Sequence, residues 1–288
     1  MVGVTFTPLV ADEEGVACYL LDIGGRTLLL DCGWDERFDT DALLHVADAL
    51  PRVDAVLLTH GSLAHVGGLP YAVATLGLRA PIYATLPVCK MAQMQLYDAY
   101  ASARAADPGF DTFDLDAVDA VTAALCEMKY AQPLRLTGRA SGITIVPQPA
   151  GHTIGGCLWR ITVEAEDILY VPAYNHQKER HLPAGSLELF IAEQRRPSLL
   201  IVSARNASLV QDVRRERLAQ QCIRLVKAAI ARGGDVLVPS DAAGRVIELL
   251  CILDHAWRAD SKLHGVPLVF LHRTAYNTVE YAKSQLEW

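Results

Sequence analysis

The sequence carries the stretch LLTHGSLAHVGGLP at residues 57–70. It begins within an apolar run, DAVLL at 54–58, which is typical of a buried strand. His60 and His65 follow in a loop that ends in a Gly-Gly turn. Imidazoles placed directly beyond the end of a strand are common ligands of catalytic zinc. Two loop histidines held by hydrogen bonds, without a metal, explain the same pattern, so this stretch alone leaves both interpretations open.

The chain around this stretch alternates strand-like and helix-like patterns. Short apolar runs bounded by turn residues predict further strands, namely CYLLD (18–22), TLLLD (27–31), QPLRL (132–136), GITIVP (142–147), CLWRITV (157–163) and DILYV (167–171). Helices are predicted from Thr40 or Asp41 to Pro51, from Leu86 to Ala105, and from an N-cap at Asp114. Two clusters of strands interleaved with helices predict a layered α/β domain with its sheets between helical layers.

The pattern changes near residue 208. Helices are predicted over 212–232, 244–258 and 274–287, with strands at DVLVP (235–239) and VPLVF (266–270) between them. This alternation indicates a parallel, doubly wound sheet, so we predict one domain over 1–207 and a second over 208–288. The last helical pattern reaches Trp288 without a C-cap signal, and we therefore expect a chain that is part of a longer protein.

Composition narrows the possible functions. The 288 residues carry a net charge of −7, which disfavours a main role in gripping a polyanion such as RNA. The seven cysteines show no C-x-x-C spacing, which indicates a reducing compartment and excludes a zinc ribbon. No apolar run approaches the roughly 20 residues that a membrane helix needs, so we expect no membrane association.

The 57–70 stretch resembles the second motif of the metallo-β-lactamase superfamily, H-x-H-x-D-H-x-G. The resemblance extends to three other motifs, in the right order and at predicted strand ends. Four positions match the family (Asp31, His60, His65 and His152), whereas Ser62, Ala64 and Ala173 stand where three metal ligands would be. By ligand count neither of the two zinc sites of the family would hold metal tightly. We therefore expect no catalytic residue, no bound zinc and no other cofactor.

Three longer stretches of the sequence indicate one branch of this superfamily. LLLDCGWDERF (28–38), IYATLPVCKMAQMQLYDAY (82–100) and GGDVLVPSDAAGRVIELLCILDHAW (233–257) are similar to the β-CASP branch of the superfamily. Within that branch they most resemble the family of hundred-kilodalton, non-catalytic subunits of the cleavage and polyadenylation specificity factor. The resemblance implies an αββα sandwich interrupted near residue 208 by a β-CASP domain. It also places Ser203 where active β-CASP nucleases have an acidic residue.

The same resemblance implies a function. It is that of a nuclear scaffold in pre-mRNA 3′-end cleavage and polyadenylation, forming a heterodimer with the catalytic endonuclease paralogue and joining the other subunits of that complex. Pre-mRNA would be contacted mainly through the complex. The alternative is a metal-dependent RNA phosphodiesterase with an atypical site that takes ligands from beyond Trp288.

Overall fold

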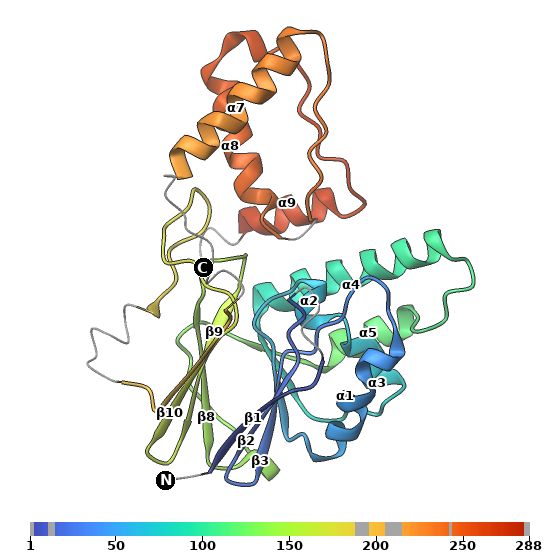
Figure 1. Cartoon of the computed structure of the whole chain (residues 1–288), viewed down its shortest axis with the longest axis vertical. Coiled ribbons are helices and arrows are strands. Elements are labelled where there is room, and N and C mark those ends of the chain that lie inside the picture. The colour runs from blue at the N-terminus through green and yellow to red at the C-terminus, as the bar shows by residue number, and fades with distance from the viewer. Residues whose placement is uncertain (1–2, 11–14, 188–195, 205–214, 242–243, 285–288) are drawn as a thin grey trace.

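The computed structural model describes residues 3–10, 15–187, 196–204, 215–241 and 244–284. Two sheets face each other, and most of the helices before residue 130 pack on the outer face of the first sheet (Figure 1). Residues 215–284 form a second, helical unit beyond one end of the sheets (Figure 1). Within the described part of the chain, no helix is both long and apolar enough to cross a membrane.

The first sheet, sheet A, has its strands in chain order: β1 (Val4–Pro8), β2 (Tyr19–Ile23), β3 (Arg26–Leu30), β4 (Ala55–Leu57), β5 (Ile82–Thr85) and β6 (Leu125–Met128). The first three strands are antiparallel, and β3 to β6 are parallel. Parallel strands need crossover connections. These are η1 (Thr40–Leu43), α1 (Leu44–Ala49), η2 (Leu50–Arg52), α2 (Leu63–Val66), α3 (Leu69–Ala74), α4 (Leu86–Ala106) and α5 (Leu115–Ala124).

The second sheet, sheet B, runs in the order β11-β10-β9-β8-β7. Its strands are β7 (Leu134–Arg135), β8 (Ile143–Pro149), β9 (Cys157–Val163), β10 (Glu166–Val171) and β11 (Leu199–Val202), with η3 (Gly138–Ala140) between the first two. Only β11 is parallel to its neighbour. The edge strand β11 leaves Leu200 and Val202 more than half exposed.

Two hydrophobic cores explain the layering. One lies between the sheets, where Leu28, Leu30 and Leu57 of sheet A meet Ile145, Trp159 and Ile161 of sheet B, all fully buried. The other lies between sheet A and its helices. Two hydrogen bonds also join the sheets, because the Cys157 amide donates to the Thr59 carbonyl at 2.9 Å and the Trp159 indole donates to the Leu58 carbonyl at 3.0 Å.

The second unit consists of α7 (Arg215–Ala231), α8 (Val246–Ala259), η4 (Ser261–Leu263) and α9 (Ala275–Ser284). The domain boundary predicted at 207/208 lies outside the described residues. The strands predicted at 235–239 and 266–270 are wrong, because among the described residues neither segment joins a sheet. Their apolar composition favours strands, but a strand also needs a hydrogen-bonded neighbour. Without one, Leu237 and Leu271 are each 91% exposed.

Most other predicted elements of the first unit are confirmed within a few residues. Thr40 and Asp41 are the predicted N-cap residues of the first helical segment, but the N-cap is Asp39, whose carboxylate accepts the Asp41 amide, and the segment begins at Thr40 as a 3₁₀ turn. The helix with its N-cap at Asp114 ends at Ala124, and Leu125 begins β6 instead of continuing the helix.

Candidate functional site

Three of the residues predicted to form a site meet at one edge of the sheet pair. His60 follows β4, His65 is in α2, and His152 follows β8. The ring centroids of His60 and His65 are 4.8 Å apart, and those of His60 and His152 are 5.6 Å apart. We call these three residues the histidine cluster.

Asp31 is connected to the histidine cluster through hydrogen bonds to Thr59, the residue before His60. It is fully buried at the end of β3, with a positive φ of 57° that aspartate tolerates better than most residues. Its carboxylate accepts hydrogen bonds from the Thr59 amide at 2.7 Å, the Thr59 hydroxyl at 2.8 Å and the Tyr170 hydroxyl at 2.8 Å. Burial outweighs these bonds and raises the pKa of the Asp31 carboxyl to about 7. Asp31 thereby joins the ends of β3 and β4 to β10, which is a structural role.

His60 receives its orientation from the same group of residues. Its Nδ1 lies 2.9 Å from Thr59 Oγ1. When Asp31 is ionised, the Thr59 hydroxyl hydrogen points to the carboxylate, so Thr59 Oγ1 accepts from Nδ1 and the neutral ring carries its lone pair on Nε2. Burial, and then the neighbouring His65 and His152, hold the pKa of His60 well below its ordinary value. His60 Nε2 is buried and has no hydrogen-bond partner among the described residues.

A glycine allows the chain to pass close to this nitrogen. A Cβ at Gly156 would lie 2.8 Å from both His60 Nε2 and Thr153 Oγ1, so no larger residue fits there without movement. Thr153 Oγ1 is a second buried atom without a partner in the described part of the chain. The loop that carries both residues is anchored to the start of α4, where Thr85 Oγ1 donates to the Gly155 carbonyl at 2.7 Å.

The three positions that lack the expected ligands are occupied differently. Ser62 Oγ lies 2.8 Å from His65 Nδ1, so the serine holds one nitrogen of that ring. Ala64 and Ala173 are partly buried and have no donor atom in their side chains. The Ala64 carbonyl accepts the Ala17 amide at 2.8 Å, which fixes this loop against the chain before β2.

Zinc does not fit the described residues. In the part of the chain that the structure describes, no group of three or more His, Cys, Asp or Glu side chains is arranged to hold a metal ion. One imidazole nitrogen is bonded to Ser62, and no carboxylate faces the cluster from the positions of Ala64 and Ala173. A zinc site needs about four ligands in tetrahedral arrangement, so no step of chemistry is derived through a metal here.

Ser203 lies at the end of β11, apart from the histidine cluster. It follows β11, whose Val202 is paired with Val171 of β10, so Ser203 stands one strand away from Ala173. Ser203 is exposed.

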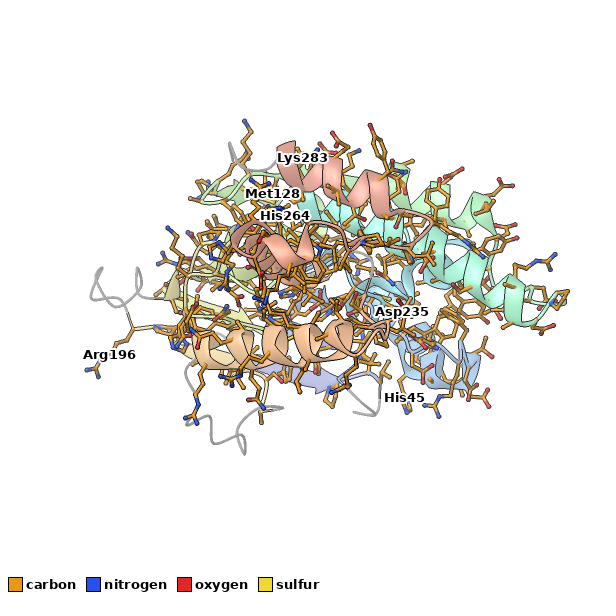
Figure 2. The ribbon with its side chains drawn as sticks, turned by 90° about the horizontal axis from the view of Figure 1, so that it is seen from above. His45, Met128, Arg196, Asp235, His264 and Lys283 are labelled. Atoms are coloured by element: carbon orange, nitrogen blue, oxygen red, sulfur yellow. The ribbon has the colours of Figure 1, made fainter. Side chains whose placement is uncertain are left out.

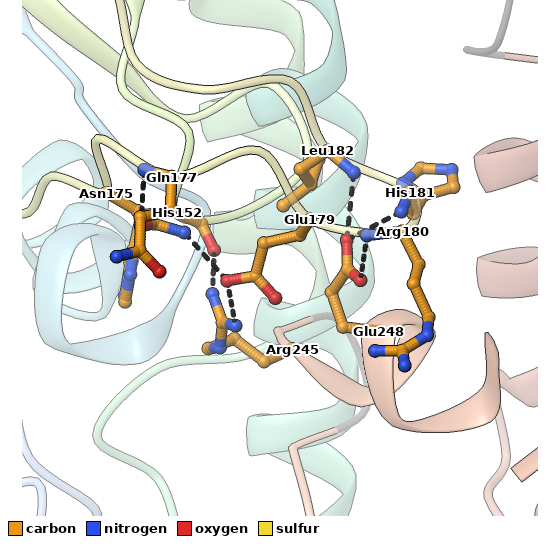
Figure 3. Close-up of polar contacts among 9 residues, drawn as sticks. All are labelled: His152, Asn175, Gln177, Glu179, Arg180, His181, Leu182, Arg245 and Glu248. Carbon is orange, nitrogen blue, oxygen red and sulfur yellow. Dashed lines mark hydrogen bonds and ion pairs between the residues drawn. The ribbon is translucent and has the colours of Figure 1, made fainter. Parts of the chain in front are cut away.

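Several important residues carried no recognisable signal in the sequence. Tyr170 is one of four successive buried residues of β10, so no alternation in the sequence distinguishes it. Arg245 of the second unit donates to the His152 carbonyl at 3.0 Å and forms an ion pair with Glu179 (Figure 3). These contacts join residues more than 60 positions apart in the chain. His45 and His264 lie outside the cluster and are exposed on different parts of the surface (Figure 2).

Known proteins similar to this chain include subunits of a cleavage and polyadenylation factor and an endoribonuclease. The chain is 43% identical over 280 residues to the probable cleavage and polyadenylation specificity factor subunit 2 of Drosophila melanogaster, covering 96% of this chain and 36% of that protein. It is 42% identical over 287 residues to cleavage and polyadenylation specificity factor subunit 2 of Oryza sativa subsp. japonica, covering 99% and 38%. Similarity to endoribonuclease ysh1 of Schizosaccharomyces pombe is lower, at 28% over 268 residues, covering 90% and 33%.

The chain therefore spans a little over a third of the length of the subunit 2 proteins that it matches. A family model described as a metallo-beta-lactamase superfamily domain matches residues 20–201, which is more than half of the chain. This range contains the histidine cluster and both sheets, except for β1, the first residue of β2 and the last residue of β11. By fold, motif order and family match, the chain belongs to the metallo-β-lactamase superfamily.

Proposed function

We propose that this chain is the metallo-β-lactamase part of a non-catalytic subunit of the pre-mRNA 3′-end cleavage and polyadenylation machinery. The proposal includes the β-CASP branch, a nuclear location and a heterodimer with the catalytic endonuclease paralogue. Support comes from relatives named as subunit 2 at about 40% identity over nearly the whole chain, against 28% for an endoribonuclease.

One observation carries the non-catalytic part of the proposal. Ser62, Ala64 and Ala173 stand at three ligand positions, and Ser62 is bonded to His65 instead of leaving room for a metal. A hydrolase of this family relies on metal to generate hydroxide near neutral pH. Among the residues that the structure describes, no group of three or more His, Cys, Asp or Glu side chains is arranged to hold such a metal. The chain would therefore contribute shape and not chemistry.

The charge of the chain supports a scaffold role. At a net charge of −7, the chain would repel the phosphate backbone over most of its surface. Pre-mRNA would then be held mainly by other subunits of the complex.

The test is to purify the full-length protein alone and together with its endonuclease paralogue. We expect stable co-purification of the pair. Zinc measured by mass spectrometry should be present in the paralogue and absent from this protein, and cleavage of a polyadenylation-site RNA should occur only with the paralogue. Stoichiometric zinc in this protein, or EDTA-sensitive cleavage by this protein alone, would contradict the proposal.

A second function is favoured by one observation. The buried His60 Nε2 lone pair has no partner among the described residues and is of the kind that a metal or a water takes up. The alternative is thus a metal-dependent RNA phosphodiesterase with an atypical site. The same zinc measurement and RNA cleavage assay separate it from the scaffold.

A further inference from the structure

The second unit is fixed to the first at the loop between β10 and β11. Apolar contacts form the base of this interface, where Val246 and Ile247 of α8 and Ala282 of α9 pack with Met91, Ile154 and Leu182 of the first unit. All six side chains are buried. Apolar contacts are non-directional and do not by themselves fix how two surfaces are aligned. The polar contacts beside them therefore determine the alignment of the two units.

The first polar contact is a buried carboxylate. Glu248, in the first turn of α8, is 4% exposed. Its Oε1 accepts the His181 and Leu182 amides at 2.9 and 2.8 Å, and its Oε2 accepts the Arg180 amide at 3.0 Å (Figure 3). Three successive amides thus surround an anion supplied by the other unit, which is the arrangement that proteins use to bind small anions.

The second polar contact lies one turn earlier. Arg245, at the N-terminal end of α8, donates to the His152 carbonyl at 3.0 Å and pairs with Glu179 (Figure 3). The Glu179 carboxylate also accepts the Asn175 side-chain amide at 2.7 Å. The Asn175 main-chain amide in turn donates to the Ala150 carbonyl at 2.8 Å, beside His152. One side chain of the second unit therefore holds both strand-end loops beside the histidine cluster.

We propose that Glu248 and Arg245 form a lock that couples the position of the second unit to the loop carrying His152. Moving α8 away would leave three amides and a carboxylate without partners at the same time, so the lock is either closed or open, with no gradual intermediate. A ligand or protein that binds the second unit and shifts α8 would then move the loop that carries His152. A change in that loop would likewise shift α8. Arg245 acts here as a positioning residue for that loop. This coupling is independent of whether the protein binds metal.

The test is hydrogen exchange, measured by mass spectrometry on the full chain with two variants and two matched controls on the same helix. Glu248→Gln leaves at most one acceptor for three amides, and Arg245→Ala removes both contacts of the guanidinium. Asp254→Asn and Arg258→Ala break an exposed ion pair within α8 and serve as the controls. We expect Glu248→Gln to speed the exchange of residues 180–182 at least about tenfold.

The coupling between the second unit and the His152 loop is tested by hydrogen exchange in segments that contain none of the substituted residues. With the lock open, exchange should also rise in residues 150–156 and in α9, while the controls leave both unchanged. Rapid exchange confined to residues 180–182 would overturn the proposal, because Glu248 would then stabilise only its own loop. If Glu248→Gln does not fold, Arg245→Ala gives the answer alone, since that side chain is 41% exposed and the Glu179 carboxylate it leaves still accepts the Asn175 side-chain amide. Unchanged exchange over 150–156 in this variant would likewise overturn the coupling.

Discussion

Replacing Asp31 with asparagine should change how the stability of this protein depends on pH. Burial raises the pKa of the Asp31 carboxyl from 3.8 to about 7, so the folded protein keeps a proton on this group where the unfolded protein has lost it. The free energy of unfolding therefore falls as pH rises through this window, by about 1.4 kcal/mol per pH unit and about 4 kcal/mol in all.

The titration of His60 changes the free energy of unfolding with pH in the opposite direction to that of Asp31. Burial and two neighbouring histidines hold its pKa well below 6.5. Below about pH 6.5 the unfolded protein takes up a proton on this ring that the folded protein does not, so the free energy of unfolding rises with pH there. In the parent protein the His60 slope therefore opposes the Asp31 slope below about pH 6.5. In Asp31→Asn only the His60 slope remains.

The quantity to measure is the difference between variant and parent, because all other groups contribute equally to both. Urea unfolding, followed by tryptophan fluorescence at closely spaced pH values, should show this difference rising by about 1.4 kcal/mol per pH unit until the pH reaches the folded-state pKa of Asp31, about 7. Asp111→Asn, at an exposed position, is the control and should give a curve parallel to that of the parent. A difference for Asp31→Asn that does not vary with pH would refute the reasoning, since Asp31 would then be ionised throughout.

Three further predictions concern the site, the core and the surface. The combined change Ser62→His, Ala64→Asp and Ala173→Asp should give the full-length protein measurable zinc affinity but little or no nuclease activity. The reason is that it restores the ligands without the hydrogen bonds that would support them. Equal, negligible binding in zinc titrations of variant and parent would contradict this. Trp159→Phe removes the indole N–H that donates to a buried carbonyl at 3.0 Å and should lower the free energy of unfolding by about 1–3 kcal/mol, visible as a lower urea midpoint. Leu237→Lys should reduce self-association in light scattering over a range of concentrations, since this side chain is 91% exposed; identical masses for variant and parent would count against it.

The sequence predicts the buried strands well because their signal is local. Residues 27–31 and 157–163 are apolar runs that lie between two layers, so composition alone identifies them. β1 was missed because all five of its residues are exposed, which leaves no hydrophobic pattern to detect. Residues 235–239 have the composition of a buried strand, yet whether they pair depends on chain elsewhere, which no local pattern reports.

The same distinction applies to the site. The three histidines could be predicted to converge because each follows a recognisable motif, and the rings do lie within 6 Å of a neighbour. The long-range hydrogen bonds that support the cluster come from Tyr170, which donates to Asp31 139 residues away, and from Arg245, which donates to the main-chain carbonyl of His152 93 residues away. Such pairs depend on the packing of the two sheets and the second unit, so they could not be derived from spacing. Whether metal is absent, as expected, stays a prediction.

The two hydrogen bonds between the sheets have a consequence for how proteins of this architecture acquire or lose chemistry. Facing sheets joined by apolar contacts alone are free to slide by fractions of an ångström, and that is enough to spoil a metal geometry. Here the Leu58 and Thr59 carbonyls are tied to Trp159 and Cys157, directly beside His60. These two bonds, together with the bond from Tyr170 to Asp31, fix the position of one layer against the other. Because neither the main-chain groups nor the Trp159 indole belongs to the positions of the family's metal ligands, substitutions at those positions change what the site can bind and leave these bonds between the sheets in place.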